Sequence, residues 1–184
     1  KAKLKRGQIA PVSWRDGIHL TGTSIWCDAK RSRDICFVSA ASALRHAKHG
    51  QLVATPQTLQ MLEKPGEQAA SQLAVPYGQP FTLGTQRIEL FASGHGLGAA
   101  SLLVHLEGAK VIYAGGINPR GSLVGGALDH RAADRVGQLL LELQGKDRSI
   151  LVVVTHSRQL AAMLSRQMEL NDGQLATISG REGD

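Results

Sequence analysis

Histidine is the residue of this chain best suited to chemistry, and four of its seven histidines are candidate metal ligands: His46, His49, His95 and His156. His46 and His49 are three residues apart, which puts both on one face if that segment is helical. Three imidazoles and a water molecule can hold a zinc ion that hydrolyses a substrate. The competing interpretation of His46 and His49 is two surface histidines on a polar turn of helix. His19 and His105 stand in strand-like patterns, which favours structural roles.

The two cysteines offer less chemistry. Cys27 and Cys36 are nine positions apart, which is not a zinc-ligand spacing, and we expect two small buried apolar residues. The chain also has no Gly-x-x-x-x-Gly-Lys-Ser/Thr sequence with which to cradle phosphates.

The net charge of +6 favours an anionic partner such as nucleic acid. Two basic runs are the candidate phosphate contacts: Lys1, Lys3, Lys5 and Arg6, then Lys30, Arg31 and Arg33. The other basic residues are scattered, and aromatic residues make up only 4% of the chain, so an extensive base-stacking platform is not expected. No apolar run reaches the roughly 20 residues that span a membrane, and no apolar stretch follows the basic start, so we expect a cytoplasmic protein.

In the first part of the chain, short strands alternate with turns. Residues 34–39 and 52–54 are compact apolar runs typical of buried strands, and the alanine-rich residues 40–49 favour a helix. Thr55-Pro56 is expected to open a helix through Leu62, because Thr caps helices and Pro suits a first turn. Residues 81–92 predict two strands around Gly84, and residues 102–106 and 110–113 predict a hairpin.

The second part of the chain has a different pattern. We expect a loop at residues 118–127, a helix at residues 131–144 and a buried strand of the parallel type at residues 150–154. Ser157 can cap a further helix, and Asn171-Asp172-Gly173 is a hairpin turn. This order of strands and helices predicts an α/β protein.

The segment from residue 17 to about residue 118 resembles the metallo-β-lactamase fold, and within it the β-CASP and ligase-associated exonuclease branch. The likeness lies in the order of short motifs: Gly17-Ile-His-Leu, Ile25-Trp-Cys-Asp28, Ile35-Cys-Phe-Val38, Val53-Ala-Thr-Pro56, Pro76-Tyr-Gly-Gln-Pro-Phe81, Gly94-His95-Gly-Leu-Gly98 and Val111-Ile-Tyr-Ala-Gly115. The resemblance implies a metallo-β-lactamase-like αββα sandwich, partial or diverged.

The resemblance also implies a two-metal site, and at its defining motif this sequence departs from the family. The positions of the family's His-x-His-x-Asp-His motif fall on Ser39, Ala41, Ala43 and Leu44, and the bridging Asp falls on Gly116. Alanine, leucine and glycine side chains offer no donor, and a serine hydroxyl is a poor zinc ligand. Of the ligands that the resemblance implies, His95 remains.

Residues from about 126 to 175 resemble the C-terminal part of an ABC-transporter ATPase of the lipoprotein-export type. Gly126-Ala-Leu-Asp129 is similar to its D-loop, Ile150-Leu-Val-Val-Val-Thr-His156 to its switch strand and Met168-Glu-Leu-Asn-Asp-Gly173 to its closing hairpin. The phosphate loop, the signature motif and the acidic Walker B residues are missing, so no ATP site is expected.

Two divisions of the chain therefore stay open. Residues 1–120 form a degenerate metallo-β-lactamase-like half, and residues 121–184 are either a fused ABC fragment or the closing half of the same domain. In the second case His156 takes the place of the family's last metal-ligand histidine. Physical economy favours one domain, because a 50-residue tail would have to bury its apolar face against something else.

The leading hypothesis is a non-catalytic pseudo-nuclease without a cofactor, acting as a nucleic-acid-binding subunit or as the partner of an active paralogue or an ATPase. The first alternative is a hydrolase with one zinc held by His95, His156 and either His46 or His49. The second is an ABC-related assembly fragment without its own ATP site. A decayed gene product without a selected function is a further interpretation.

Overall fold

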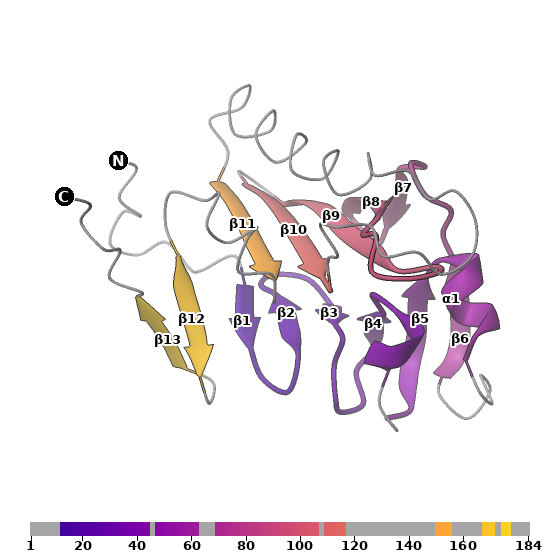
Figure 1. Ribbon diagram of the computed structural model, residues 1–184, viewed down its shortest axis with the longest axis horizontal. Coiled ribbons are helices and arrows are strands. Elements are labelled where there is room, and N and C mark those ends of the chain that lie inside the picture. Colours follow the sequence, from indigo (N-terminus) through magenta and orange to yellow (C-terminus); the bar gives the residue numbers. More distant parts are fainter. Residues whose placement is uncertain are drawn as a thin grey trace.

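The structure is a computed structural model that describes residues 12–44, 47–62, 69–106, 109–116, 150–155, 167–171 and 174–177. Two β-sheets face one another in the described part of the chain (Figure 1). The described part thus contains the two sheets of the expected sandwich, with one short α-helix and one 3-10 turn as its helical elements. Within it, no helix has the length and apolar character that crossing a membrane requires.

The first sheet has six strands in the order of the chain. The pairs β1–β2 and β2–β3 are antiparallel, whereas the pairs β3–β4, β4–β5 and β5–β6 are parallel. The strands are β1 (Val12–Trp14), β2 (Ile18–Leu20), β3 (Ile25–Cys27), β4 (Ile35–Phe37), β5 (His49–Ala54) and β6 (Ala69–Ala74).

The second sheet has five strands in the order β11-β10-β9-β8-β7. All its pairs are antiparallel except β10 with β11, so a strand from the second part of the chain is the parallel neighbour of one from the first. The strands are β7 (Phe81–Leu83), β8 (Gln86–Ala92), β9 (Ala100–Leu106), β10 (Ala109–Gly115) and β11 (Ile150–Thr155). A separate hairpin joins β12 (Met168–Asn171) to β13 (Gln174–Thr177).

The main core lies between the two sheets. Successive side chains of a strand point to opposite faces, so alternate residues of both sheets meet in this layer. The first sheet contributes Leu20, Ile25, Cys27, Phe37 and Val53, and the second contributes Ile88, Leu90, Leu102, Val104, Val111 and Tyr113. These side chains are almost completely buried, and each large apolar one contributes roughly 1.5–3 kcal/mol of transfer free energy.

A second apolar cluster covers the outer face of the first sheet. It contains Cys36, Val38, Leu52 and Ala54, which pack with side chains from two helical elements. These are η1, a 3-10 turn (Ala41–Ala43), and α1 (Pro56–Gln60). Because Cys27 belongs to the main core and Cys36 to this second cluster, the cysteines lie on opposite faces of the first sheet. Both are free and buried, as expected.

Most expectations for individual elements are confirmed. The short apolar runs form β4 and β5, Gly84 separates β7 from β8, and residues 100–115 form the expected hairpin. Thr55 caps α1 by accepting a hydrogen bond from the Thr58 N–H, although the helix ends at Gln60 rather than Leu62. The apolar run at residues 150–154 is a parallel strand, and Asn171 pairs with Gln174 across the Asp-Gly turn.

One expectation is wrong: the described residues of the segment 40–49 do not form an α-helix. Ala41–Ala43 make a 3-10 turn, and β5 begins at His49, which pairs with Ala69 of β6. The high helix propensity of alanine is a weak preference, and the tertiary structure outweighs it in this segment. Strand β6 was not expected at all. The loop at residues 118–127, the helix at residues 131–144 and the Ser157 cap lie outside the described residues.

Candidate functional site

Three residues with oxygen-bearing side chains follow the C-terminal ends of the parallel strands β3, β4 and β5. Asp28 follows β3, Ser39 lies just beyond β4 and Thr55 follows β5, so all three stand at one edge of the first sheet. The second sheet meets this edge, because the Ala100 N–H at the start of β9 donates to the Ser39 carbonyl at 2.8 Å. Carboxyl ends of parallel strands are common places for binding sites. We call this region the carboxyl edge.

A carboxylate joins the two sheets at the carboxyl edge. Asp28 accepts hydrogen bonds from the Ser39 N–H at 2.8 Å, the Ser39 hydroxyl at 2.5 Å and the Tyr113 hydroxyl on β10 at 2.7 Å. The Asp28 backbone has a φ of 46°, a left-handed conformation that Asp tolerates better than most residues. Hydrogen bonds to a charged acceptor are stronger than neutral ones, so this network ties β3, β4 and β10 together.

Tyr113 acts in this network as a permanent donor. Its ring is buried in the main core, edge-on to Phe37 with the ring centroids 6.2 Å apart. Burial, and then the nearby negative charge of Asp28, raise the pKa of the Tyr113 hydroxyl. Because both effects disfavour the phenolate, the hydroxyl keeps its proton and donates to Asp28 throughout the physiological pH range.

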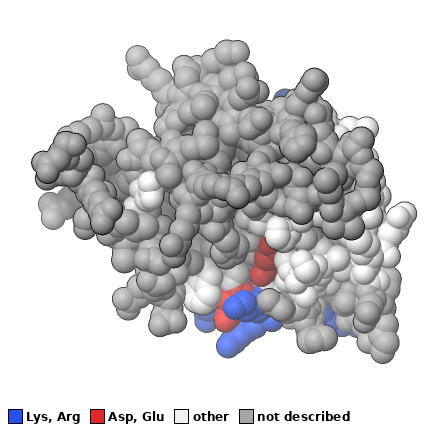
Figure 2. Space-filling model, viewed as in Figure 1, with Lys and Arg blue, Asp and Glu red and all other residues white. Residues whose placement is uncertain are grey.

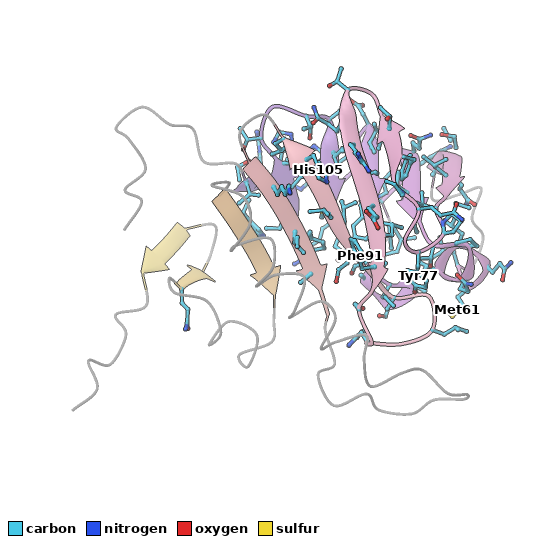
Figure 3. The ribbon with its side chains drawn as sticks, turned by 90° about the horizontal axis from the view of Figure 1, so that it is seen from above. Met61, Tyr77, Phe91 and His105 are labelled. Carbon is cyan, nitrogen blue, oxygen red and sulfur yellow. The ribbon has the colours of Figure 1, made fainter. Side chains whose placement is uncertain are left out.

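The loop of residues 93–99, between β8 and β9, is fixed at its base. The Gly98 carbonyl accepts hydrogen bonds from the Thr55 hydroxyl at 2.6 Å and the Thr58 hydroxyl at 2.8 Å. The Tyr77 hydroxyl donates to the Ala99 carbonyl at 2.9 Å. Tyr77 lies at the same end of the molecule as Met61, which caps α1 (Figure 3). The loop is therefore held against the start of α1, while its tip, with His95 and Leu97, is exposed.

His95 lies against Gly116, just beyond the end of β10. A Cβ on Gly116 would stand 3.0 Å from Cγ of the His95 ring, and one on Gly115 would stand 2.8 Å from Cβ of Ser39. The sequence-predicted positions Ser39, Gly116 and His95 thus come together at the carboxyl edge. Gly115 also pairs with Thr155, so β11 ends at this edge too.

The residues here do not fit the two metal ions that the family resemblance implies. The buried Ser39 hydroxyl donates to Asp28, Ala41 and Ala43 form the 3-10 turn, and Leu44 packs against the second apolar cluster. Gly116 has no side chain, and the His95 ring occupies the space beside it. Across the described ranges, no three His, Cys, Asp or Glu side chains are grouped so that they could hold a metal ion.

His49 is not brought together with His95. It is the first residue of β5, so its Cα lies about 16 Å along the strand from Ala54, near which the 93–99 loop is attached. His49 is 1% exposed, and neither ring nitrogen has a hydrogen-bond partner. Burial, and then the positive charge of Arg33, lower the pKa of His49. His46 and His156 lie outside the described residues.

The remaining two described histidines also lie away from the carboxyl edge. His19 stacks on Trp26 with ring centroids 4.4 Å apart, and its Nε2 is 2.8 Å from the Thr23 carbonyl. His105 is near the end of β9, five residues beyond Ala100, and Figure 3 shows it away from Tyr77 and Met61.

Two of the three basic residues that follow β3 have side chains engaged with other residues of the protein. Arg31 forms an ion pair with Asp16 at 3.1 Å. Arg33 lies over the Trp26 ring at 3.7 Å and donates to the Arg15 carbonyl at 2.9 Å. Lys30 and Arg31 are exposed, and the view in Figure 2 shows basic side chains beside acidic ones at the lower edge of this face. Lys1, Lys3, Lys5 and Arg6 lie outside the described residues.

Sequence reasoning missed the residues that hold the carboxyl edge together. Asp28 and Tyr113 were noticed only as parts of strand motifs, and Thr58 and Tyr77 were not singled out. A signal was present for Asp28, because a charged residue directly after a buried strand needs a partner. No comparable signal in the sequence pointed to Tyr113. It is 85 residues from Asp28 along the chain, and the two side chains meet through the packing of the two sheets.

Comparisons with known proteins reach only parts of this chain. No protein-family profile matches it. It is 48% identical over 50 residues to the lipoprotein-releasing system ATP-binding protein LolD of Oleidesulfovibrio alaskensis, covering 27% of this chain and 22% of that protein. The LolD of Xanthomonas euvesicatoria pv. vesicatoria is 42% identical over 67 residues, or 34% of this chain and 28% of that protein. The chain thus spans little more than a quarter of these relatives at most.

Metallo-β-lactamases are among the solved structures that the chain resembles. A HARLDQ-motif variant of the metallo-β-lactamase of Cronobacter sakazakii has a TM-score of 0.46 and 17% identity, over 74% of this chain and 70% of that one. The Rm3 metallo-β-lactamase has a TM-score of 0.46 and 11% identity, over 83% of this chain and 76% of that one.

Proposed function

We propose that this chain is a non-catalytic relative of the metallo-β-lactamase-fold nucleases, which binds nucleic acid or a partner protein instead of cleaving a substrate. The observation that carries the proposal is the chemistry of the five expected ligand positions. Ala41, Ala43, Leu44 and Gly116 offer no donor atom, and the Ser39 hydroxyl is hydrogen-bonded to Asp28.

The arrangement around these positions supports the same proposal. Hydrogen bonds among Asp28, Ser39 and Tyr113 join both sheets at the carboxyl edge, which supports an edge that holds its shape without a metal ion. His95 is fixed only through its loop, and its ring rests on the Gly116 backbone. A single imidazole at an exposed loop tip is a weak metal site, because zinc centres need three or four protein ligands.

Metal content tests the non-catalytic proposal directly. The purified, tag-free protein should contain almost no zinc, manganese or iron by elemental mass spectrometry. His95→Ala and the matched His105→Ala should leave that result unchanged. One tightly held zinc per chain that is lost in His95→Ala and kept in His105→Ala would overturn the proposal and support a one-metal hydrolase.

That alternative has one structural observation in its favour. β11 ends at Thr155 beside Gly115, and His156 is the next residue of the chain. His156→Ala therefore belongs in the same metal experiment, because a zinc held by His95 and His156 requires both. Hydrolysis of a generic phosphodiester that disappears together with the zinc would identify that activity.

For binding, we propose nucleic acid as the first ligand to test. The support is the net charge of +6 and the exposed Lys30 and Arg31. Affinity for duplex DNA, measured by fluorescence anisotropy, should fall with salt with a slope of about −0.9 per phosphate contact. Lys30→Glu with Arg31→Glu should weaken binding and flatten that slope, whereas Arg87→Glu on β8, also exposed, should not. Equal effects of both charge reversals would exclude this surface.

The match to LolD supports a second candidate, an ABC-related fragment that assembles with an ATPase. LolD is by name an ATP-binding protein of a lipoprotein-releasing system, and the match covers at most 34% of this chain in these two relatives. Since this sequence has no phosphate loop, the isolated chain should not bind ATP in equilibrium dialysis, whereas a complex with such an ATPase should. Tight ATP binding by the isolated chain would contradict this second candidate as stated.

A further inference from the structure

β6 (Ala69–Ala74) has an open side. It is the last strand of the first sheet, so one side of its backbone pairs with β5 (Figure 1). Among the strands that the structure describes, none pairs with the other side. An outer strand of six residues presents a row of backbone donors and acceptors to which another strand can add.

The outer strands β1 and β7 are protected, and the pairing of the outer strand β11 with β10 contains a register shift, whereas β6 has no such feature. β1 and β7 have three residues each, and Pro11 and Pro80 immediately precede them. β6 has the sequence Ala-Ala-Ser-Gln-Leu-Ala, without a charge or a proline, and its pairing with β5 has no bulge. Charged residues, prolines, bulges and short length are the devices that keep outer strands from pairing with other chains.

The side chains of β6 leave room for a neighbour. Ala70, Ser71, Gln72 and Ala74 are exposed and Leu73 is half-buried, so solvent reaches both faces of the strand. Exposed residues with small or neutral side chains would not obstruct a strand added beside them. Because β6 carries no charge, two identical copies of it can lie antiparallel without placing like charges opposite one another.

We propose that β6 is a homodimerisation strand, pairing antiparallel with β6 of a second copy of this chain so that the two six-stranded sheets become continuous. Antiparallel pairing of a strand with itself has two-fold symmetry, the commonest symmetry of protein dimers. A charged partner strand would find no complementary charge on β6, whereas the same neutral strand matches it. The inference is independent of the proposed function.

Sedimentation analysis over a range of protein concentrations tests this proposal. The full chain should dimerise, and Ser71→Lys with Gln72→Lys should raise the dimer dissociation constant about tenfold or more, because lysines then face lysines across the new pair. The matched control is Thr82→Lys with Thr85→Lys, two exposed positions, the first on the outer strand β7 and the second in the turn between β7 and β8. It should dimerise like the unmodified chain.

Cross-linking provides a second readout that does not depend on the lysine variant folding. Ser71→Cys or Gln72→Cys should form a disulfide-linked dimer on mild oxidation, and Thr82→Cys should not, while the native cysteines are buried. A chain that stays monomeric at every concentration, a dimer that the β6 lysines leave intact, or equal cross-linking through Thr82→Cys would each overturn the proposal.

Discussion

The imidazole ring of His95 rests on the backbone of Gly116 so closely that a methyl group there would stand 3.0 Å from its Cγ, which is tighter than an ordinary van der Waals contact. We expect Gly116→Ala to lower the free energy of unfolding by about 1 kcal/mol, because the new Cβ pushes the ring away. In a His95→Ala background the same substitution should cost almost nothing. The unfolding free energies of the four proteins of this double-mutant cycle give the coupling. Gly96→Ala, which meets open space, is the control, and additive effects would contradict the contact.

Gly98 should be far less tolerant of substitution. It has a φ of +73°, and a Cβ there would stand 2.6 Å from the Thr58 nitrogen in α1. Gly98→Ala therefore incurs both backbone strain of about 1–2 kcal/mol and a clash costing a further 1–3 kcal/mol. Gly78→Ala isolates the first effect, since Gly78 has a φ of +69° and open space around its Cβ position. Chemical unfolding should give a larger loss for Gly98→Ala, and equal losses would refute the clash.

Removing the Tyr113 hydroxyl should weaken the connection between the sheets. Tyr113→Phe deletes a hydrogen-bond donor to Asp28, and we expect a loss of about 1.5–3 kcal/mol because the acceptor is a carboxylate. Tyr77→Phe removes a hydrogen bond to a neutral carbonyl from a side chain that is 36% exposed, so about 1 kcal/mol or less is expected. Urea titrations of both variants compare the losses, and a Tyr113→Phe cost no greater than that of Tyr77→Phe would mean that the network contributes little.

His49 should make the protein sensitive to acid. The pKa of His49 in the folded state is lowered from 6.5. Below about pH 6.5 the His49 imidazole is therefore protonated in the unfolded chain but still neutral in the native state. Stability should be complete above that pH and fall by up to about 1.4 kcal/mol per pH unit as the pH drops toward the folded-state pKa.

His49→Leu should remove this dependence, and it should not destabilise the protein at pH 7.5, because both ring nitrogens lack partners. Thermal unfolding from pH 7.5 to 5 measures the slope, with His95→Gln as the control for replacing a histidine. An unchanged slope in His49→Leu would assign the acid sensitivity to other groups.

The sequence predicts strands well where their apolar residues form short uninterrupted runs or flank an obvious turn. β4, β5 and β11 are examples of the first kind, and the β7–β8 pair around Gly84 is an example of the second. β6 escapes prediction because Ala-Ala-Ser-Gln-Leu-Ala has neither alternation nor β-branched residues, and only its place beside β5 makes it a strand. Local propensity cannot identify such a strand, since tertiary pairing decides its structure.

The sequence predicts which residues lie near one another at the candidate site, but not the hydrogen bonds that hold them there. The motif order places Ser39, His95 and Gly116 in one region, and the structure brings them together. The hydrogen bonds that organise this region join Asp28 to Tyr113 and Thr55 to Gly98, pairs separated by 85 and 43 residues. Such pairs depend on how two sheets face each other, which a single sequence does not encode in any local spacing.

The parallel pairing of β10 with β11 has a consequence for the order of events during synthesis. Val111 pairs with Val152, so the second sheet gains its last strand only after the ribosome has made residues 150–155. Until then β10, with Val111 fully buried in the finished protein, carries an unsatisfied backbone edge beside strongly apolar side chains. A nascent chain that has made β10 but not residues 150–155 therefore exposes a strand edge that the finished protein covers.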